Sequence, residues 1–318
     1  MIVANVRDRE KFFLLSAQSN GAFGSEAWLA IYGSQLQLRG IYANDGQLIG
    51  GFFYLETKKF GFKFIKLPPY TPHCGLFYKN QSTNPSSVAA FRKEVIELIS
   101  DYFLKLKSSL CILAFPIQEI DLQPFIWKGF KVIPNYTYRI DLKRELSEIT
   151  ADFDSKNRNT IAKAAKAEVN IKINALSATE LLQFFSNSLH TVGANVYSKE
   201  LEAVLSMSQS ATFSISAFYQ NKLVACVYCL FDQNVCYYLL GGTNKDAGVQ
   251  GLNNLLILKA IELAKEKGCT VFDFEGSMLQ GVEKFFRGFG GQLQAYYTAN
   301  KGAKWLEVIL KFKEPGIF

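Results

Sequence analysis

Short runs of alternating hydrophobic and polar residues predict both strands and helices in the first half of the chain. Two β-rich runs, residues 36–42 and 47–56, are joined by Asn44-Asp45-Gly46, and an Asp-Gly pair suits the positive φ angles of a hairpin turn. Asn84 followed by Pro85 is typical of a helix start, here of an amphipathic helix reaching about residue 107. Further strands are expected at 60–67, 110–115 and 136–142, with a short helix at 121–128.

The second half begins with a polar helix and continues as a meander of strands. Asp154 is expected to cap a helix over residues 156–168, and a longer helix over 252–267 should end at Gly268. Turns at 220–221 and 232–234 separate three strands of a meander. Strands are expected at 169–174, 212–219, 222–231, 235–240, 270–274 and 293–299, and shorter helices at 179–189, 199–207 and 282–287.

The two halves repeat the same order of elements: a hairpin, a strand, a long helix, a short strand, a short helix and a last strand. Trp127-Lys128-Gly129-Phe130 in the first half matches Phe286-Arg287-Gly288-Phe289 in the second. Such self-similarity with mixed elements predicts a duplicated α+β domain. We expect domains at 1–145 and 146–318, each a mixed, mainly antiparallel sheet flanked by helices, with the first a degenerate copy.

Composition narrows the class of protein. The 318 residues are 49% hydrophobic and 20% charged, which excludes a disordered or collagen-like chain. The net charge of +7 favours an anionic partner without identifying one. No apolar run is long enough to cross a bilayer, and the first residues lack the order of a signal peptide. We therefore expect a cytoplasmic protein, whose six cysteines are small buried hydrophobes.

Several kinds of chemistry are disfavoured by missing motifs. The chain has no Gly-x-Ser-x-Gly, no P-loop and no His-Glu-x-x-His. Its only histidines are His73 and His190, so we expect no metal site and no histidine-based triad. His73 lies in the proline-rich segment 68–75. That segment suits a loop that positions a substrate, and equally a stiff connector.

Residues 235–300 carry the densest set of candidate functional groups. A strand ending at Gly241-Gly242, a helix starting at 251–254 and a strand ending at Asp273–Ser277 should form a crevice. The helix start offers free N–H groups to a phosphate or an oxyanion. Glu275 could act as a general base toward an amine or simply cap a backbone group. Arg287 could hold an anionic group or form a surface ion pair.

The order of meander, polar loop, helix and strand resembles the core of the GNAT acyltransferase superfamily. Phe272-Asp273-Phe274-Glu275-Gly276-Ser277, together with Phe285-Phe286-Arg287-Gly288-Phe289-Gly290-Gly291, is similar to the branch with two tandem GNAT-like domains. That branch holds the Fem-type peptidoglycan-bridge aminoacyltransferases and BioF2-like acyltransferases. Residues 156–166 resemble the basic helix that opens its second domain, and residues 135–142 the strand before it.

The resemblance implies transfer of an acyl or aminoacyl group to an amine acceptor, such as a cell-wall or sugar precursor. The donor would be acyl-CoA or aminoacyl-tRNA, with no tightly bound cofactor and no DNA partner. Two departures matter: Asn253 and Leu255 replace the small residues that cradle the coenzyme A pyrophosphate in ordinary GNAT enzymes, and Arg287 stands where Fem-type enzymes carry lysine.

These arguments select one set of site residues. Glu275 and Arg287 are predicted to be catalytic. The predicted donor-binding residues are Tyr238, Leu240, Gly241, Asn253 and Asn254. The predicted acceptor-binding residues are Arg158, His73 and Ser277.

Two alternatives remain open at the level of sequence. One is an acetyl-CoA-dependent N-acetyltransferase acting on a small amine. The other is a non-catalytic paralogue whose cleft binds a glycan or a nucleotide-sugar precursor.

Overall fold

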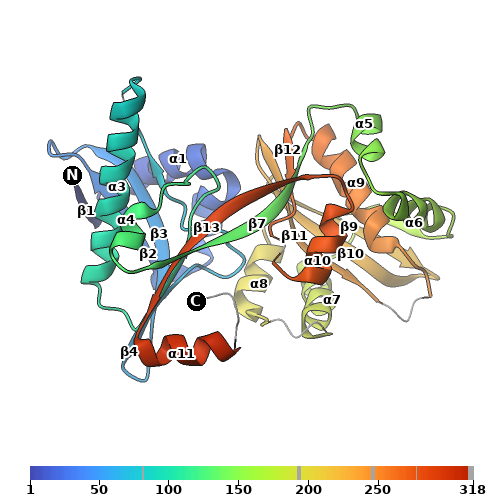
Figure 1. The fold of residues 1–318 in the computed structure, drawn as a ribbon. Helices are drawn as coiled ribbons and strands as arrows, with labels where there is room; N and C mark the ends of the chain where they lie inside the picture. The colour runs from blue at the N-terminus through green and yellow to red at the C-terminus, as the bar shows by residue number, and fades with distance from the viewer. Residues whose placement is uncertain (81, 192–194, 245–247, 277, 314–318) are drawn as a thin grey trace. The chain divides into compact units, whose positions relative to one another are not determined.

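The computed structural model describes residues 1–313 except 81, 192–194, 245–247 and 277. It divides into two compact units (Figure 1): Met1–Asn135 with Ala295–Phe318, and Tyr136–Gln294. The expected division was 1–145 and 146–318, so the difference lies mainly in residues 295–318, which group with the first unit. The physical reason is strand β13 (Gln292–Gly302), whose second half pairs antiparallel with β6 (Leu110–Ala114) of the first unit.

The first unit is a mixed sheet with helices on its faces. Its sheet order is β1-β2-β3-β4-β6-β13, with β5 beside β3. The only parallel pair among these described strands is β4–β6; their other pairings are antiparallel. The strands are β1 (Ile2–Asn5), β2 (Leu36–Tyr42), β3 (Leu48–Lys59), β4 (Phe62–Lys66) and β5 (Phe77–Tyr78). The helices are α1 (Arg9–Asn20), α2 (Glu26–Ala30), α3 (Pro85–Lys105), α4 (Gln123–Trp127) and α11 (Lys304–Lys313), with 3₁₀ turns at Gly21–Gly24 and Gly33–Gln35.

Helix α3 covers one face of this sheet and begins as predicted. The Asn84 side chain accepts hydrogen bonds from the backbone N–H groups of Ser86 and Ser87, at 3.0 and 3.2 Å, and Pro85 occupies the first turn. Its apolar stripe packs on buried residues of β2, β3 and β6, among them Phe52. On the other face, the α1 ring of Phe12 comes so close to Gly51 that a larger residue there would collide with it.

The second unit repeats this plan with sheet order β7-β12-β11-β10-β9-β8. Here β11–β12 is the parallel pair, and the other pairings are antiparallel. The strands are β7 (Lys131–Asp141), β8 (Asn170–Ile173), β9 (Thr212–Tyr219), β10 (Lys222–Phe231), β11 (Val235–Thr243) and β12 (Val271–Asp273). The helices are α5 (Leu146–Ala151), α6 (Ser155–Ala165), α7 (Ala178–Thr191), α8 (Ser198–Leu205), α9 (Leu252–Glu266) and α10 (Gln280–Arg287).

Helix α9 lies on one face of the second sheet and supplies most of its core. Its buried residues, including Leu256 and Ala260, pack on alternate residues of β9, β10 and β11. The opposite face is covered by α7 and α8, since the Tyr228 hydroxyl of β10 donates to the Val204 carbonyl of α8 at 2.7 Å. Each unit is therefore the predicted mixed, mainly antiparallel sheet flanked by helices.

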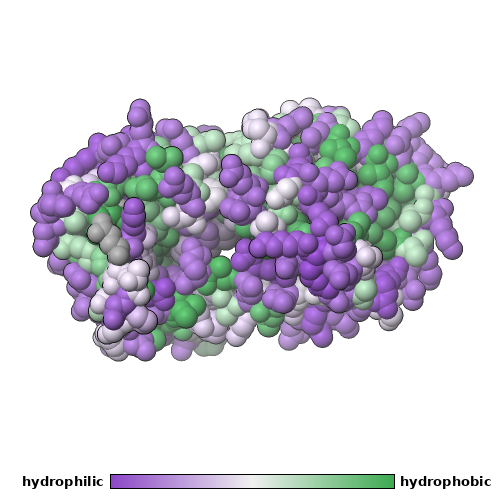
Figure 2. Space-filling view, turned by 90° about the horizontal axis from the view of Figure 1, so that it is seen from above, coloured by the Kyte–Doolittle hydropathy of each residue, from purple (hydrophilic) through white to green (hydrophobic). Residues whose placement is uncertain are grey.

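The face of the molecule drawn in Figure 2 is mostly hydrophilic. On this face, hydrophobic side chains gather only in small groups among polar ones. All six cysteines are buried and free, as expected from their apolar surroundings. No helix in the described part of the chain combines the length and apolarity needed to span a bilayer.

Candidate functional site

Strands β11 and β12 run parallel at first and then separate. They pair only from Val235 to Tyr237 on β11, opposite Val271 to Asp273 on β12. Beyond Tyr237, β11 continues to Thr243 beside β10 alone. Within the described residues, the backbone groups of 238–243 that point away from β10 therefore have no strand partner. Such groups are available to hydrogen-bond a ligand inserted between the two strands.

A β-bulge at Leu239 marks the point of separation. Tyr228 of β10 pairs with Leu240, but Cys229 pairs with Tyr238, so one residue of β11 is left over. Because side chains alternate between faces, the extra residue places Tyr238 on the α9 face and Leu240 on the α7–α8 face. The two predicted donor-binding residues thus lie on opposite sides of the strand, with the bulge between them.

Tyr238 lies along β11 and fills the space next to Gly241. Its ring packs edge-on against Phe286 of α10 at 5.7 Å between ring centroids. Its hydroxyl lies 3.4 Å from the side-chain nitrogen of Asn253, at the start of α9. Burial raises the pKa of the Tyr238 hydroxyl, which therefore stays protonated. The structure brings together Tyr238, Gly241 and Asn253, three of the predicted donor-binding residues.

The start of helix α9 is held against α6. Gly251 adopts a left-handed conformation, with φ at +81°, and has no side-chain cap. A β-carbon there would lie 2.5 Å from the methyl group of Thr160. The Asn254 side chain donates to the Asn157 side chain of α6 at 2.9 Å. Asn254 therefore ties two helices together, and α6 crowds the helix start that was expected to receive an anion.

Glu275 follows β12 at the mouth of the separation. Its φ of +63° is rare for a residue with a β-carbon. This backbone conformation is held by the N–H group of Glu275, which donates to the Asp273 carboxylate at 2.9 Å. The pKa of Glu275 is raised well above its usual value, mainly by burial. The negative charge of Asp273 raises this pKa further, and the positive charge of Arg139 lowers it. A carboxyl group with a raised pKa is better matched to taking a proton near neutral pH.

Asp273, which is buried, and Arg139, which is half-buried, form an ion pair near Glu275 that sequence reasoning missed. The Arg139 Nε lies 3.0 Å from the Asp273 carboxylate. The Thr137 hydroxyl donates to the same carboxylate at 2.7 Å. Burial nevertheless raises the pKa of Asp273. The sequence does place a charged residue within each of the strands β7 and β12. It does not show that these two strands are neighbours, which only the sheet order reveals.

Arg287, the second predicted catalytic residue, belongs to a different group of side chains. Its Nε lies 2.9 Å from the carboxylate of Glu283, one turn earlier on α10. The same carboxylate oxygen accepts from the Tyr138 hydroxyl at 2.8 Å. The Arg287 side chain keeps 61% of its surface exposed. Phe274 packs toward α10 while Asp273 faces the other side, so no contact joins Arg287 to Glu275 among the described residues.

Arg158 has structural partners on the helix that precedes its own. Its guanidinium donates to the backbone carbonyls of Ala151, at 3.0 Å, and of Phe153. It thus satisfies carbonyls at the end of α5, where a helix leaves acceptors unpaired. Ser277, a predicted acceptor-binding residue, lies outside the described residues.

His73 belongs to the first unit. In that unit the parallel strands β4 and β6 also separate, and the segment that contains His73 fills the space between the neighbouring strands. There β4 and β6 pair in parallel only at Phe64–Leu110 and Ile65–Cys111. Beyond this point Cys74 joins the flanking strands: its N–H donates to the Ala114 carbonyl, and its carbonyl accepts from the Phe53 N–H, both at 2.8 Å. Within the described part of the chain, no backbone segment bridges β11 and β12 of the second unit in this way.

The His73 ring is half-buried beside this bridge. Its Nδ1 accepts from the Gly75 N–H at 3.1 Å. Burial lowers the pKa of His73 to about 4, so the ring is neutral at physiological pH. These contacts account for His73 as part of a stiff connector. Its predicted acceptor-binding role has no contact here that supports it.

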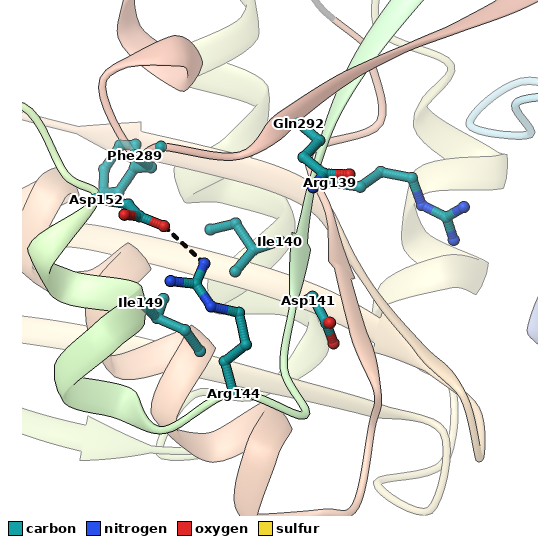
Figure 3. A pocket seen from close by; sticks show the side chains of 9 residues that line it. Arg139, Ile140, Asp141, Arg144, Ile149, Asp152, Phe289 and Gln292 are labelled. Atoms are coloured by element: carbon teal, nitrogen blue, oxygen red, sulfur yellow. Dashed lines mark hydrogen bonds and ion pairs between the residues drawn. The ribbon is translucent and has the colours of Figure 1, made fainter.

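A separate shallow pocket opens on the second unit beside α5 (Figure 3). Arg144 and Asp152 form an ion pair of 2.6 Å across it, and Ile140, Ile149 and Phe289 supply its apolar lining. The Arg139 guanidinium points away from this pocket (Figure 3), toward Asp273. None of the predicted site residues lines it.

Comparisons with known proteins identify a domain family and similar folds. Residues 157–287 match the family model described as acetyltransferase (GNAT) domain. No curated protein matches the chain. The fold is similar to that of FemX over 98% of this chain and 99% of that one, with a TM-score of 0.65 and 12% identity.

Two further solved structures share the fold over nearly their whole length. L-PGS from Bacillus licheniformis matches with a TM-score of 0.58 and 14% identity over 98% of both chains. A tandem GNAT protein from the clavulanic acid biosynthesis pathway matches with a TM-score of 0.55 and 9% identity, over 95% of this chain and 98% of that one. Residues 157–287 therefore match a GNAT acetyltransferase domain, and the fold over nearly the whole chain is similar to that of FemX and of a tandem GNAT protein.

Proposed function

We propose that the second unit transfers an acyl or aminoacyl group from an activated ester or thioester to an amine. The observation that carries this proposal is the separation of β11 from β12 at the Leu239 bulge, with Glu275 at its mouth. Unpaired backbone groups on one side and a half-buried carboxyl group on the other fit a flat carbonyl group placed between the strands. Arg287, on the outer surface of α10, is proposed to bind an anionic part of a substrate.

In the proposed reaction the amine nitrogen attacks the carbonyl carbon of the donor. The backbone N–H groups of the unpaired β11 edge would stabilise the resulting oxyanion. Glu275 takes the proton that the nitrogen loses as the C–N bond forms. As the C–O or C–S bond breaks, Glu275 returns that proton to the leaving oxygen or sulfur. No covalent intermediate on the protein is needed, so the main contribution of the protein is to position the reactants.

The start of α9 supports an ester donor over a coenzyme A thioester. A pyrophosphate would need close approach to the N–H groups of residues 252–255. Thr160 of α6 lies against Gly251 there, and Asn253 and Leu255 replace the small residues that permit such approach. We therefore propose aminoacyl-tRNA as the donor and an amine-bearing cell-wall or sugar precursor as the acceptor.

The proposal can be tested with the full chain by comparing three donors and two variants. Transfer to amine acceptors is measured with aminoacyl-tRNA, acetyl-CoA and longer acyl-CoA thioesters as donors. Glu275→Gln should lower kcat/KM by about 10² to 10⁴ with the preferred donor. Glu266→Gln, at the exposed end of α9, is the matched control and should leave the rate unchanged.

The outcomes separate the alternatives. Turnover with acetyl-CoA but not with aminoacyl-tRNA would reassign the donor and keep the acyl-transfer chemistry. Unchanged turnover in Glu275→Gln would remove Glu275 from the mechanism. Binding of a glycan or a nucleotide sugar without turnover of any donor would show a non-catalytic paralogue.

A further inference from the structure

An exposed aromatic and basic surface lies on the first unit and shares no residue with the groups used above. It is formed by the tip of the β3–β4 hairpin and the outer face of α11, which lie next to each other in Figure 1. The rings of Phe62 and Trp305 join them, with centroids 5.4 Å apart. We call it the hairpin–α11 surface. Its members are Lys58, Lys59, Phe60, Phe62, Lys63, Lys304, Trp305, Val308, Ile309, Lys311 and Phe312.

Helix α11 presents a hydrophobic stripe to solvent. Trp305, Val308, Ile309 and Phe312 are spaced as one face of a helix. All four are exposed, and Phe312 keeps 85% of its surface. Leaving this stripe in water costs free energy that a folded chain ordinarily avoids. The hydrophobic face is therefore not explained by packing within the described chain.

The hairpin tip holds an aromatic residue where the fold disfavours one. Phe60 and Gly61 are the two turn residues, with φ of +50° and +79°. Asn or Asp is the favoured residue at the first of these positions, because a residue with a bulkier side chain is strained there. Phe60 is nevertheless 88% exposed and so gains little from burial. The strain and the exposure together indicate that Phe60 serves a contact outside the chain.

Lysines border these hydrophobic groups, and two are placed against each other. Lys58 and Lys63 are directly opposed across the hairpin, an arrangement of like charges that destabilises a sheet. Lys59, Lys304 and Lys311 are exposed nearby.

Two acidic groups that neighbour this surface within the described residues, Glu56 and Glu307, are already paired. Glu56 lies 3.4 Å from the Lys63 ammonium. Glu307, on the inner side of α11, lies 2.7 Å from Lys131 and accepts from the Gly302 N–H at 3.0 Å. The remaining charge of the surface is positive, which favours an anionic partner.

We propose that the hairpin–α11 surface docks on an anionic phospholipid bilayer. Aromatic and aliphatic side chains would enter the headgroup region while the lysines contact lipid phosphates. A second copy of the chain fits less well, because two such surfaces would bring lysines of both copies together. This inference is independent of the proposed acyl transfer, since none of its residues belongs to the candidate site.

Flotation of the full chain with lipid vesicles tests the proposal. Vesicles of phosphatidylglycerol mixed with phosphatidylcholine should carry the protein, and vesicles of pure phosphatidylcholine should not. Raising the salt from about 0.1 M to about 1 M shortens the range of charge interactions from roughly 10 to 3 Å and should release most of the protein.

Three variants locate the contact. Phe60→Asn removes the aromatic ring and suits the turn, so the fold should hold while partitioning falls by about tenfold. Lys58→Gln with Lys59→Gln should lower binding by about fivefold per lysine. Val308→Gln with Phe312→Gln should reduce binding by more than Phe60→Asn does, since it removes two exposed side chains.

Matched controls lie on the second unit. Ile173→Gln and Lys222→Gln change an exposed aliphatic residue and an exposed lysine of that unit, and should bind vesicles as wild type does. Equal binding to both kinds of vesicle, or no binding to either, overturns the proposal. Wild-type binding by Phe60→Asn overturns it as well, and so does a dimer in solution that Phe312→Gln dissociates, because the face would then belong to a second copy.

Discussion

The phenolic oxygen of Tyr238 occupies the space in which a side chain on residue 241 would lie. A β-carbon at Gly241 would stand 1.6 Å from that oxygen and 2.6 Å from the ring carbon that bears it. The ring cannot simply swing away, because Phe274 and Phe286 pack against it. The bulge places residues 238 and 241 on the same face of β11. Because the Tyr238 ring fills the space there, residue 241 must be glycine.

Gly241→Ala is expected to destabilise the protein by about 1 to 3 kcal/mol, because it overpacks the α9 side of β11. Thermal unfolding measures the change. Adding Tyr238→Phe should recover part of the loss, since the closest atom is then gone. Gly281→Ala is the control: nothing lies near its β-carbon and it sits in a helix, so stability should hold or rise. A double variant no more stable than Gly241→Ala alone would contradict this account.

Glu275→Gln should stabilise the protein at neutral pH, in contrast to its expected effect on turnover. The folded state raises the Glu275 pKa and therefore binds the proton more tightly than the unfolded state. Stability from this group is present at low pH and is lost as pH rises from about 4.5 through the raised pKa. Glutamine does not ionise, so the Glu275→Gln variant does not lose this stability as the pH rises.

Melting temperatures of wild type and Glu275→Gln measured from about pH 4 to pH 8 check the sign. The difference should be small at the acid end and grow as pH rises. A difference that shrinks with rising pH would mean that Glu275 is stabilised as the carboxylate.

Removing one partner of the Arg139–Asp273 pair should cost more than removing both. Arg139→Met leaves the buried Asp273 carboxyl without its cation, and Asp273→Asn leaves the guanidinium without its anion. Either change is expected to cost about 3 to 5 kcal/mol. The double variant should cost less, because the amide introduced by Asp273→Asn would keep an oxygen for the Thr137 hydroxyl and the Glu275 N–H.

Urea unfolding of the two single variants and the double variant gives the coupling energy. Arg144→Gln breaks a shorter ion pair, of 2.6 Å, that is largely exposed, and it should cost less than about 1 kcal/mol. Additive effects of Arg139→Met and Asp273→Asn would show that the two charges do not depend on each other.

His73 should make the first unit sensitive to acid. The folded state lowers its pKa to about 4, so below about pH 6.5 the unfolded chain binds a proton that the folded chain does not. Stability from this group is fully present above about pH 6.5 and is lost as pH falls toward 4, by roughly 3 kcal/mol.

Unfolding free energies across that range check this expectation. His73→Gln should remove the histidine component of the acid loss, and His190→Gln, at the exposed end of α7, should retain it. An acid profile that His73→Gln leaves unchanged would place the titration elsewhere.

The elements of the fold were largely predictable because they rest on local signals. Asn84 and Asp154 cap helices where expected, and Gly268 follows α9 with its φ at +87°. Helices α1, α2, α5 and α11 were missed. The apolar stripe of α11 lies at the surface, so its periodicity has no buried partner to confirm it.

The site was predictable only where its residues are close in the chain. Glu275 was found from its place after a strand. Its partner Arg139 was not, since pairing β7 with β12 joins residues more than a hundred positions apart. The bulge at Leu239 and the bridge made by Cys74 are patterns of backbone hydrogen bonds. No residue type in these two segments predicts such a pattern.

The position of β13 in the chain has a consequence for synthesis. The ribosome completes the whole of the second unit before it makes residues 295–302, which pair with β6. Until then the first unit exposes an edge of β6 with unpaired backbone groups, while its partner unit can already be folded. The first unit therefore keeps an open sheet edge while more than 150 further residues are made, and during that interval the edge can pair with another chain.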